Sequence, residues 1–114
     1  MTYQDSRMLR LQPGTPDRLA ASIHGVIDAE TAQRLADRLA ALLAAETREV
    51  HLDVDQANPL SAAAAAILLF PLLQAARTHD PSITLTVHRA DSRTSARMHE
   101  LGLDRLVTRS DQPA

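Results

Sequence analysis

The sequence has no cysteine, no lysine and no tryptophan, and aromatic residues make up only 2% of it. Without cysteine the chain cannot form disulfides, thiol nucleophiles or cysteine-ligated zinc sites. The scarcity of aromatic rings leaves no stacking platform for bases, which argues against binding of single-stranded nucleic acid. A net charge of −2 gives no support to DNA binding either. We therefore expect no nucleic-acid partner.

Glycine is also scarce, with three residues at positions 14, 25 and 102. Phosphate-binding loops need exposed backbone NH groups, usually from glycines close to the ligand, and no nucleotide-binding fingerprint is present. The longest apolar run, residues 62–73, is shorter than the about 20 residues that span a membrane. The first ten residues lack the apolar core of a signal peptide. We expect a cytoplasmic protein without membrane insertion.

No motif for catalysis or metal binding is visible. The five histidines do not form the HxxxH or HExxH spacings that hold a metal, so we expect no metal and no other cofactor. His51 and Asp53 alternate with apolar residues, and we interpret them as part of a solvated strand face. Asp53 and Asp55 have structural or solvated roles on the same reasoning, because nothing nearby indicates a pocket that would separate their pKa values. The absence of catalytic motifs favours a binding module over an enzyme.

The chain is nevertheless rich enough in aliphatic residues to fold, with 45% of its residues hydrophobic. Its length suits one domain, which we place at residues 1–114 with a core of about 8–109. Alternating and helical hydrophobic spacings predict the order ββαβαβαβ. The strands are expected at 8–12, 18–25, 49–55, 83–89 and 103–109, and the helices at 29–46, 61–78 and 90–102. This order predicts an α/β fold with a mixed β-sheet and with helices packed mainly on one face.

Polar residues mark the expected helix ends. Asp28 and Ser61 are placed to cap the first two helices, and Asp91 or Ser92 to cap the third. Gly102 ends that third helix as a C-terminal glycine does.

Two features within the helices carry further expectations. The first helix should bury a stripe of aliphatic residues at helical spacing: Ala32, Leu35, Leu39, Leu42 and Leu43. In the second helix a proline, Pro71, removes one backbone hydrogen bond, which predicts a kink or break near residues 67–71.

Three stretches together resemble the STAS domain of bacterial anti-sigma factor antagonists. They are "IHGVIDAETAQRL", "VHLDVDQANPLSAAAAAILL" and "DSRTSARMHELGLDRLVTR". The first is similar to the family's G-x-I-D turn and helix, the second to its signature strand, loop and helix start, and the third to its late helix and final strand. The resemblance covers residues 9–109 and implies a mixed sheet with helices mainly on one side.

The resemblance also implies a function. Such antagonists bind a kinase that is also the anti-sigma factor, and the kinase inactivates them by phosphorylating the second serine of a D-S-S-G motif. A phosphate adds nearly two negative charges, which is enough to break an interface. The resemblance thus implies a bacterial, non-catalytic regulator of transcription that binds a protein partner. It also suggests a partner-binding surface made of six residues: Asp28, Asn58, Ser61, Ala62, Ala63 and Ala64.

The sequence departs from the family at this motif. Alignment through Asp53 places Ala62 and Ala63 on the two serines and Ala64 on the glycine. The usual phosphoacceptor position is therefore occupied by Ala63, which has no hydroxyl. Ser61 is interpreted as a helix cap, with a displaced phosphoacceptor as the alternative.

Other functions stay open at this point. The chain could be a STAS interaction subunit of a larger assembly, such as the partner of a transporter ATPase, or a homodimeric scaffold. In both cases the apolar segment "AAAAAILLFPLL", with Phe70 and Leu72, would face a partner or a second copy. Less favoured ideas are a groove for an apolar ligand between the first two helices, and an enzyme of unknown chemistry.

Overall fold

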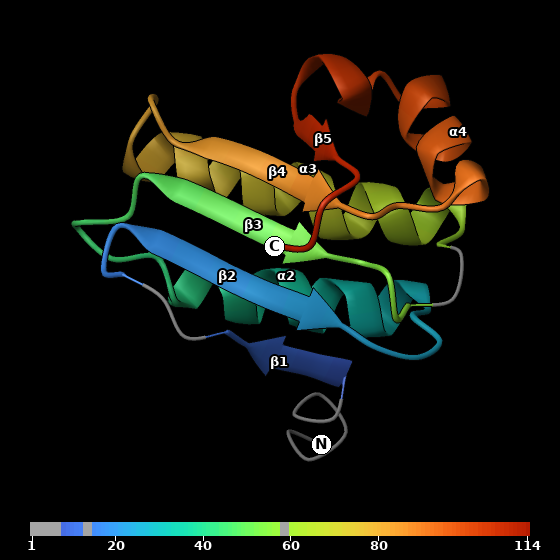
Figure 1. Cartoon of the computed structure of the whole chain (residues 1–114), viewed down its shortest axis with the longest axis horizontal. Helices are drawn as coiled ribbons and strands as arrows, with labels where there is room; N and C mark the ends of the chain where they lie inside the picture. Colours follow the sequence, from blue (N-terminus) through green and yellow to red (C-terminus); the bar gives the residue numbers. More distant parts are fainter. Residues whose placement is uncertain (1–7, 13–14, 58–59) are drawn as a thin grey trace.

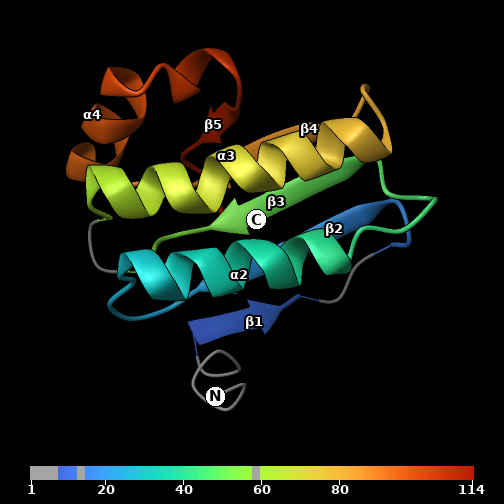
Figure 2. The same ribbon diagram turned by 180° about the vertical axis from the view of Figure 1, so that it is seen from behind.

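The chain folds into one mixed sheet with helices on one face (Figures 1 and 2). The computed structural model describes residues 8–12, 15–57 and 60–114. The sheet contains five strands in chain order: β1 Leu9–Leu11, β2 Arg18–Ile23, β3 Glu49–Asp53, β4 Thr84–His88 and β5 Thr108–Ser110. β1 runs antiparallel to β2, and the other pairs are parallel. The predicted fold class and mixed sheet are confirmed.

The helices explain why one sheet face is apolar. They are α2 Ala29–Ala41, α3 Ala62–His79 and α4 Ser92–Glu100. α2 and α3 lie side by side in front of the sheet in Figure 2, whereas α4 lies at the side of the sheet where β5 is. Strand residues that face the helices are aliphatic and buried, for example Val50 and Leu52 of β3 and Leu85 and Val87 of β4. The intervening residues lie on the sheet face that no helix covers.

The first helix is shorter than predicted. α2 ends at Ala41, with Leu42 as its C-cap residue, whereas the sequence predicted a helix to residue 46. Leu35 and Leu39 are buried as expected, but Leu42 is 39% exposed and Leu43 only partly buried. The early end has a local cause, because the Thr47 hydroxyl accepts a hydrogen bond from the Ala44 NH in a turn.

The sequence predicted a kink or break near residues 67–71, and the break is wrong, whereas a kink stays a prediction. α3 is one uninterrupted helix of 18 residues with Pro71 inside it. Pro71 and Ile67, whose carbonyl loses its NH partner, both lie on the half-exposed side of the helix, where water can bond the free oxygen. Seven other residues of α3 are buried in the core and hold the helix in place.

The predicted last strand begins later than expected. Leu103–Arg105 form a 3-10 turn, η1, and the strand starts only at Thr108. Gly102, which precedes the turn, has a left-handed backbone with φ of 74°. This is the conformation that a helix-ending glycine supplies, as the sequence predicted.

α3 is long and apolar enough to cross a membrane, by length and composition alone. Core helices of soluble proteins pass the same test. Here the buried side of α3 packs on α2 and on the sheet, so its apolar composition has a structural explanation.

The two sides of α3 predict different mutational costs. Leu68→Ala should lower the free energy of unfolding by about 2–5 kcal/mol, because Leu68 is fully buried and the substitution leaves a cavity. Gln74→Ala, at an exposed position of the same helix, should change it by less than about 0.5 kcal/mol. Urea unfolding of both variants measures the difference, and equal costs would contradict this placement of the helix.

Candidate functional site

The candidate site lies at the carboxyl end of the parallel strands. β2, β3 and β4 run in the same direction, so the helices that follow them all begin at this end of the sheet (Figure 2). In open α/β sheets this end commonly carries the binding site, because loops that project from a rigid scaffold converge there. Here the loops lead into α2, α3 and α4.

Each of these helices begins with a capped first turn. Asp28 accepts a hydrogen bond from the Thr31 NH at 2.7 Å, Ser61 from the Ala64 NH at 3.0 Å, and Asp91 from the Thr94 NH at 2.8 Å. The predicted caps Asp28 and Ser61 are thus confirmed, and of the two candidates for the third helix the cap is Asp91. These side chains satisfy NH groups that have no partner within the helix.

The Asp28 carboxyl is ionised over a wide pH range. The Thr31 NH, and next to it the Thr31 side chain, lower the pKa of Asp28 below its ordinary value of 3.8. A fixed negative charge therefore stands at the start of α2, where the helix dipole favours it.

Hydrogen bonds tie the loops at this end to one another. The Gly25 NH donates to the Gln56 carbonyl at 3.1 Å, and Gly25 forms an isolated parallel bridge with Ala57. The Leu60 NH donates to the Thr94 hydroxyl of α4 at 3.3 Å. Gly25 adopts a φ of 88°, which costs a glycine little, and this allows the sharp turn beside the neighbouring loop. These bonds therefore connect the described parts of the loops that lead into α2, α3 and α4.

The residues aligned with the family motif differ in exposure. Ser61, Ala62 and Ala63 are exposed at the start of α3. Ala64 is fully buried, so its side chain belongs to the core and is closed to a partner. Asn58 lies outside the residues that the structure describes. Of the proposed contact residues on α3, three are thus open to solvent.

An exposed valine on this surface was not among the predicted site residues. Val26 is 65% exposed, directly after Gly25 and before the Asp28 cap. Its neighbour Ile27 is 6% exposed and packs in the core. Within the stretch "GVID" the sequence gives two adjacent aliphatic residues, and only the turn geometry decides which of them points outward.

Of the two roles expected for Asp53, structural or solvated, the structural one is confirmed and the solvated one is wrong. Its side chain is 2% exposed and forms an ion pair with Arg89, whose Nη2 lies 2.7 Å from Asp53 Oδ2 and whose Nε lies 3.2 and 3.1 Å from the two carboxylate oxygens. Arg89 has a left-handed backbone with φ of 56°, which directs its side chain back to the end of β3. Asp55 is 41% exposed and lies 3.5 Å from Arg89 Nη1, so it contributes more weakly.

The pKa of Asp53 follows from two opposed causes. Burial disfavours the charged carboxylate, but the hydrogen bonds from Arg89, and then those from the Asp55 and Ala114 NH groups, outweigh burial and lower the pKa below 3.8. Asp53 therefore serves as a structural anion, and its two oxygens are occupied by donors.

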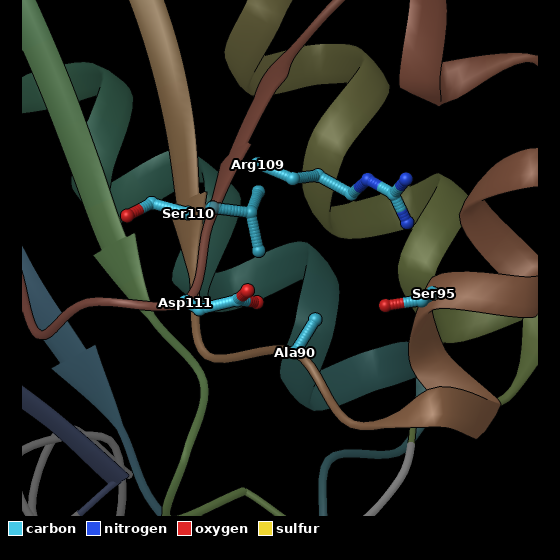
Figure 3. A pocket seen from close by; sticks show the side chains of 6 residues that line it. Ala90, Ser95, Arg109, Ser110 and Asp111 are labelled. Carbon is cyan, nitrogen blue, oxygen red and sulfur yellow. The ribbon is translucent and has the colours of Figure 1, made fainter.

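A small polar pocket lies beside this region. It measures about 260 Å³ and is lined by residues of β4, β5, α4 and the chain after β5. Arg109 and Ser95 extend into it from β5 and α4, and Asp111 lies on another wall (Figure 3). Arg109 and Asp111 give its walls charges of opposite sign.

The idea of a ligand groove between α2 and α3 gains no support. The two helices pack against each other, and the small side chains of Ala32, Ala36, Ala64 and Ala65 are buried between elements of the core. Alanines here allow close packing.

The ion pair generates a prediction. Asp53→Asn should lower the free energy of unfolding by about 1–3 kcal/mol, because charge-assisted hydrogen bonds to Arg89 are lost. Since the folded-state pKa of Asp53 is lowered, the difference from the wild type is complete above 3.8 and shrinks as the pH falls below it. Asp55→Asn is the matched control and should cost less than about 0.5 kcal/mol. Equal effects of the two variants in urea unfolding would refute the special role of Asp53.

Comparison with known proteins agrees with this architecture. A family model described as "Mlab, STAS domain" matches residues 12–108. A crystal structure of an anti-sigma factor antagonist from Mycobacterium paratuberculosis matches with a TM-score of 0.71 and 19% identity, over 91% of this chain and 85% of that chain. At this identity the likeness concerns the fold. No match was found among the curated proteins. Because the family model covers most of the sequence, the chain belongs to the STAS domain family.

Proposed function

We propose that this STAS domain is a non-catalytic regulatory module that binds an anti-sigma factor or partner-switch kinase. The single observation that carries the proposal is the surface at the carboxyl end of the strands. There Val26, Ala62 and Ala63 are exposed between the capped starts of α2 and α3. We name this surface, together with Asp28 and Ser61, the docking surface. Exposed apolar residues on a rigid scaffold are typical of protein contacts.

The small side chains of this surface suit close approach. Ala62 and Ala63 leave the first turn of α3 accessible to a partner, and Val26, which precedes the start of α2, adds exposed apolar area at the same end of the sheet. Hydrogen bonds through Gly25, Gln56, Leu60 and Thr94 hold the described residues around this surface in place. Residues that are already held in place lose less conformational entropy on binding.

The proposal includes binding that does not respond to phosphorylation at the usual position. Ala63 has no hydroxyl, so the family's switch cannot operate there. The Ser61 hydroxyl accepts a hydrogen bond from the Ala64 NH and caps α3. Such a cap stabilises a helix by about 1 kcal/mol, which supports a structural role for Ser61. We therefore expect the partner complex to be the same with and without ATP.

A second candidate function rests on another exposed feature. Phe70 is 38% exposed on α3 and borders a shallow hollow of about 430 Å³ with Leu73, Gln74, Arg77 and Thr78. This side of α3 could contact a second copy or another subunit of an assembly, such as a transporter ATPase. Leu72, which was expected to take part, is fully buried and belongs to the core. The candidate therefore depends on Phe70.

One capture experiment tests both candidates. The tagged full chain is incubated with extract of its native host, with and without ATP, and bound proteins are identified by mass spectrometry. We expect an anti-sigma factor or kinase-like regulator in equal amounts under both conditions. Ala63→Arg should reduce its recovery at least tenfold by steric blockage of the docking surface. Ala41→Arg, at an exposed position at the other end of α2, is the control and should leave recovery unchanged.

The remaining outcomes separate the two functions. If Phe70→Glu abolishes recovery and Ala63→Arg does not, the second candidate replaces the first. An ATP-dependent loss of the complex together with a phosphate on Ser61 would contradict phosphorylation-independent binding. Recovery of no regulator by a folded wild-type chain would refute the proposed function.

A further inference from the structure

Two histidines meet on the sheet face that no helix covers. Sheet alternation places Glu49 and His51 of β3 and His88 of β4 on this face. After β5 the chain turns back across the same face and ends over β3 (Figure 1). We call residues 111–114 the covering segment. Its contacts are the Gln112 carbonyl with His88 Nδ1 at 2.8 Å and the Ala114 NH with Asp53 Oδ2 at 3.4 Å.

The rings form a continuous line of hydrogen bonds. His51 Nε2 lies 2.7 Å from Glu49 Oε1, and His51 Nδ1 lies 2.7 Å from His88 Nε2. The line continues from His88 Nδ1 to the Gln112 carbonyl. The ring centroids are 5.0 Å apart. The His51 side chain is 12% exposed and His88 is 6% exposed, so both rings are largely shielded from water.

Counting protons defines the charge of the pair. A carboxylate and a peptide carbonyl only accept hydrogen bonds, so His51 Nε2 and His88 Nδ1 must both donate. The contact between the rings needs a third proton. Two neutral imidazoles carry one NH each, so the pair holds one proton more than two neutral rings. The Glu49 carboxylate balances this charge, and a proton moved from His51 to Glu49 leaves the total unchanged.

A second extra proton is incompatible with this geometry. Both rings would then be cations, and His51 Nδ1 and His88 Nε2 would both carry hydrogen atoms directed at each other across 2.7 Å. Two like charges at this distance repel strongly in a site that is largely shielded from water. Glu49 can offset the charge on His51, but it does not contact His88. The rings must therefore separate when the second proton binds.

The other charged groups near the pair do not offset a positive charge on the His88 ring. Asp53, its neighbour on β3, is already paired with Arg89, and Asp55 also faces Arg89. From β1 and β2 the charged or titratable groups of this face are Arg10, Arg18 and His24, and His24 contacts the Ser22 hydroxyl. From the covering segment the group is Asp111, which lies at the pocket beside β5.

We propose that the His51–His88 pair is an acid-sensitive contact that holds the covering segment on the sheet and releases it from His88 when a second proton binds. Release would uncover the polar face of β3 and β4. This surface is separate from the docking surface, and the inference does not depend on the proposed function.

The test is nuclear magnetic resonance of the 15N-labelled full chain between about pH 8 and pH 5, the range in which histidines ordinarily change charge. Near neutral pH the ring signals of His51 and His88 should report three nitrogen-bound protons. Backbone order parameters of residues 111 and 112 should be about 0.85 near neutral pH and fall below about 0.6 on acidification. Two neutral rings near neutral pH, or order that persists while both rings become cations, would overturn the proposal.

Two variants distinguish ring repulsion from a general effect of acid. His51→Ala removes one cation, and His88 Nδ1 can then donate to Gln112 at every pH, so the covering segment should stay ordered to about pH 5. His99→Ala removes an exposed ring that is paired with Asp104 on another part of the surface. This variant should behave as the wild type. If His51→Ala loses order as the wild type does, the proposal fails. His51→Gln provides a second variant that keeps a polar side chain should His51→Ala unfold.

Discussion

The ion pair between the buried Asp53 and the partly exposed Arg89 is the interaction on which the carboxyl end of the sheet depends. It joins the ends of β3 and β4, the strands from which the loops to α3 and α4 depart. The Val54 NH donates to the His88 carbonyl beside it, and the Arg89 NH donates to the Ser110 carbonyl, so β5 is held at the same place. A buried carboxylate costs free energy unless donors surround it. Here Arg89 and two backbone NH groups supply these donors. They hold the end of β3 in place beside the end of β4.

Under the proposed alignment of Ala63 with the family's phosphorylated serine, this arrangement explains how that position can lose its hydroxyl and keep its shape. The start of α3 is held by the Ser61 cap and by the bond from Leu60 to Thr94, and neither needs the residue at position 63. Alanine at this position has no hydroxyl and does not disturb the helix, since alanine is a strong helix former. Under the proposed function the docking surface is therefore available at all times, as a regulator without a phosphorylation switch requires.

Much of the architecture could be predicted from local patterns. Alternating aliphatic residues predict β3 and β4, and the caps at Asp28 and Ser61 predict where α2 and α3 begin. The predictions that were wrong failed because of contacts between residues far apart in the sequence. The burial of Asp53 depends on an arginine 36 positions later that adopts a left-handed backbone. The alternation around His51 looks like a solvated face because the covering segment, which shields it, has no hydrophobic pattern. For the candidate site, spacing predicts the exposed start of α3, but the orientation of Val26 depends on the turn at Gly25.

The central claim is that a protein partner binds at the starts of α2 and α3. Its most direct test is titration of the 15N-labelled chain with the purified partner, followed residue by residue in amide spectra. The account predicts the largest shifts at Val26, Asp28, Ser61, Ala62 and Ala63, with residues 70–78 and the open sheet face unaffected. Shifts that cluster around Phe70 and Arg77 while the docking surface stays unchanged would contradict it.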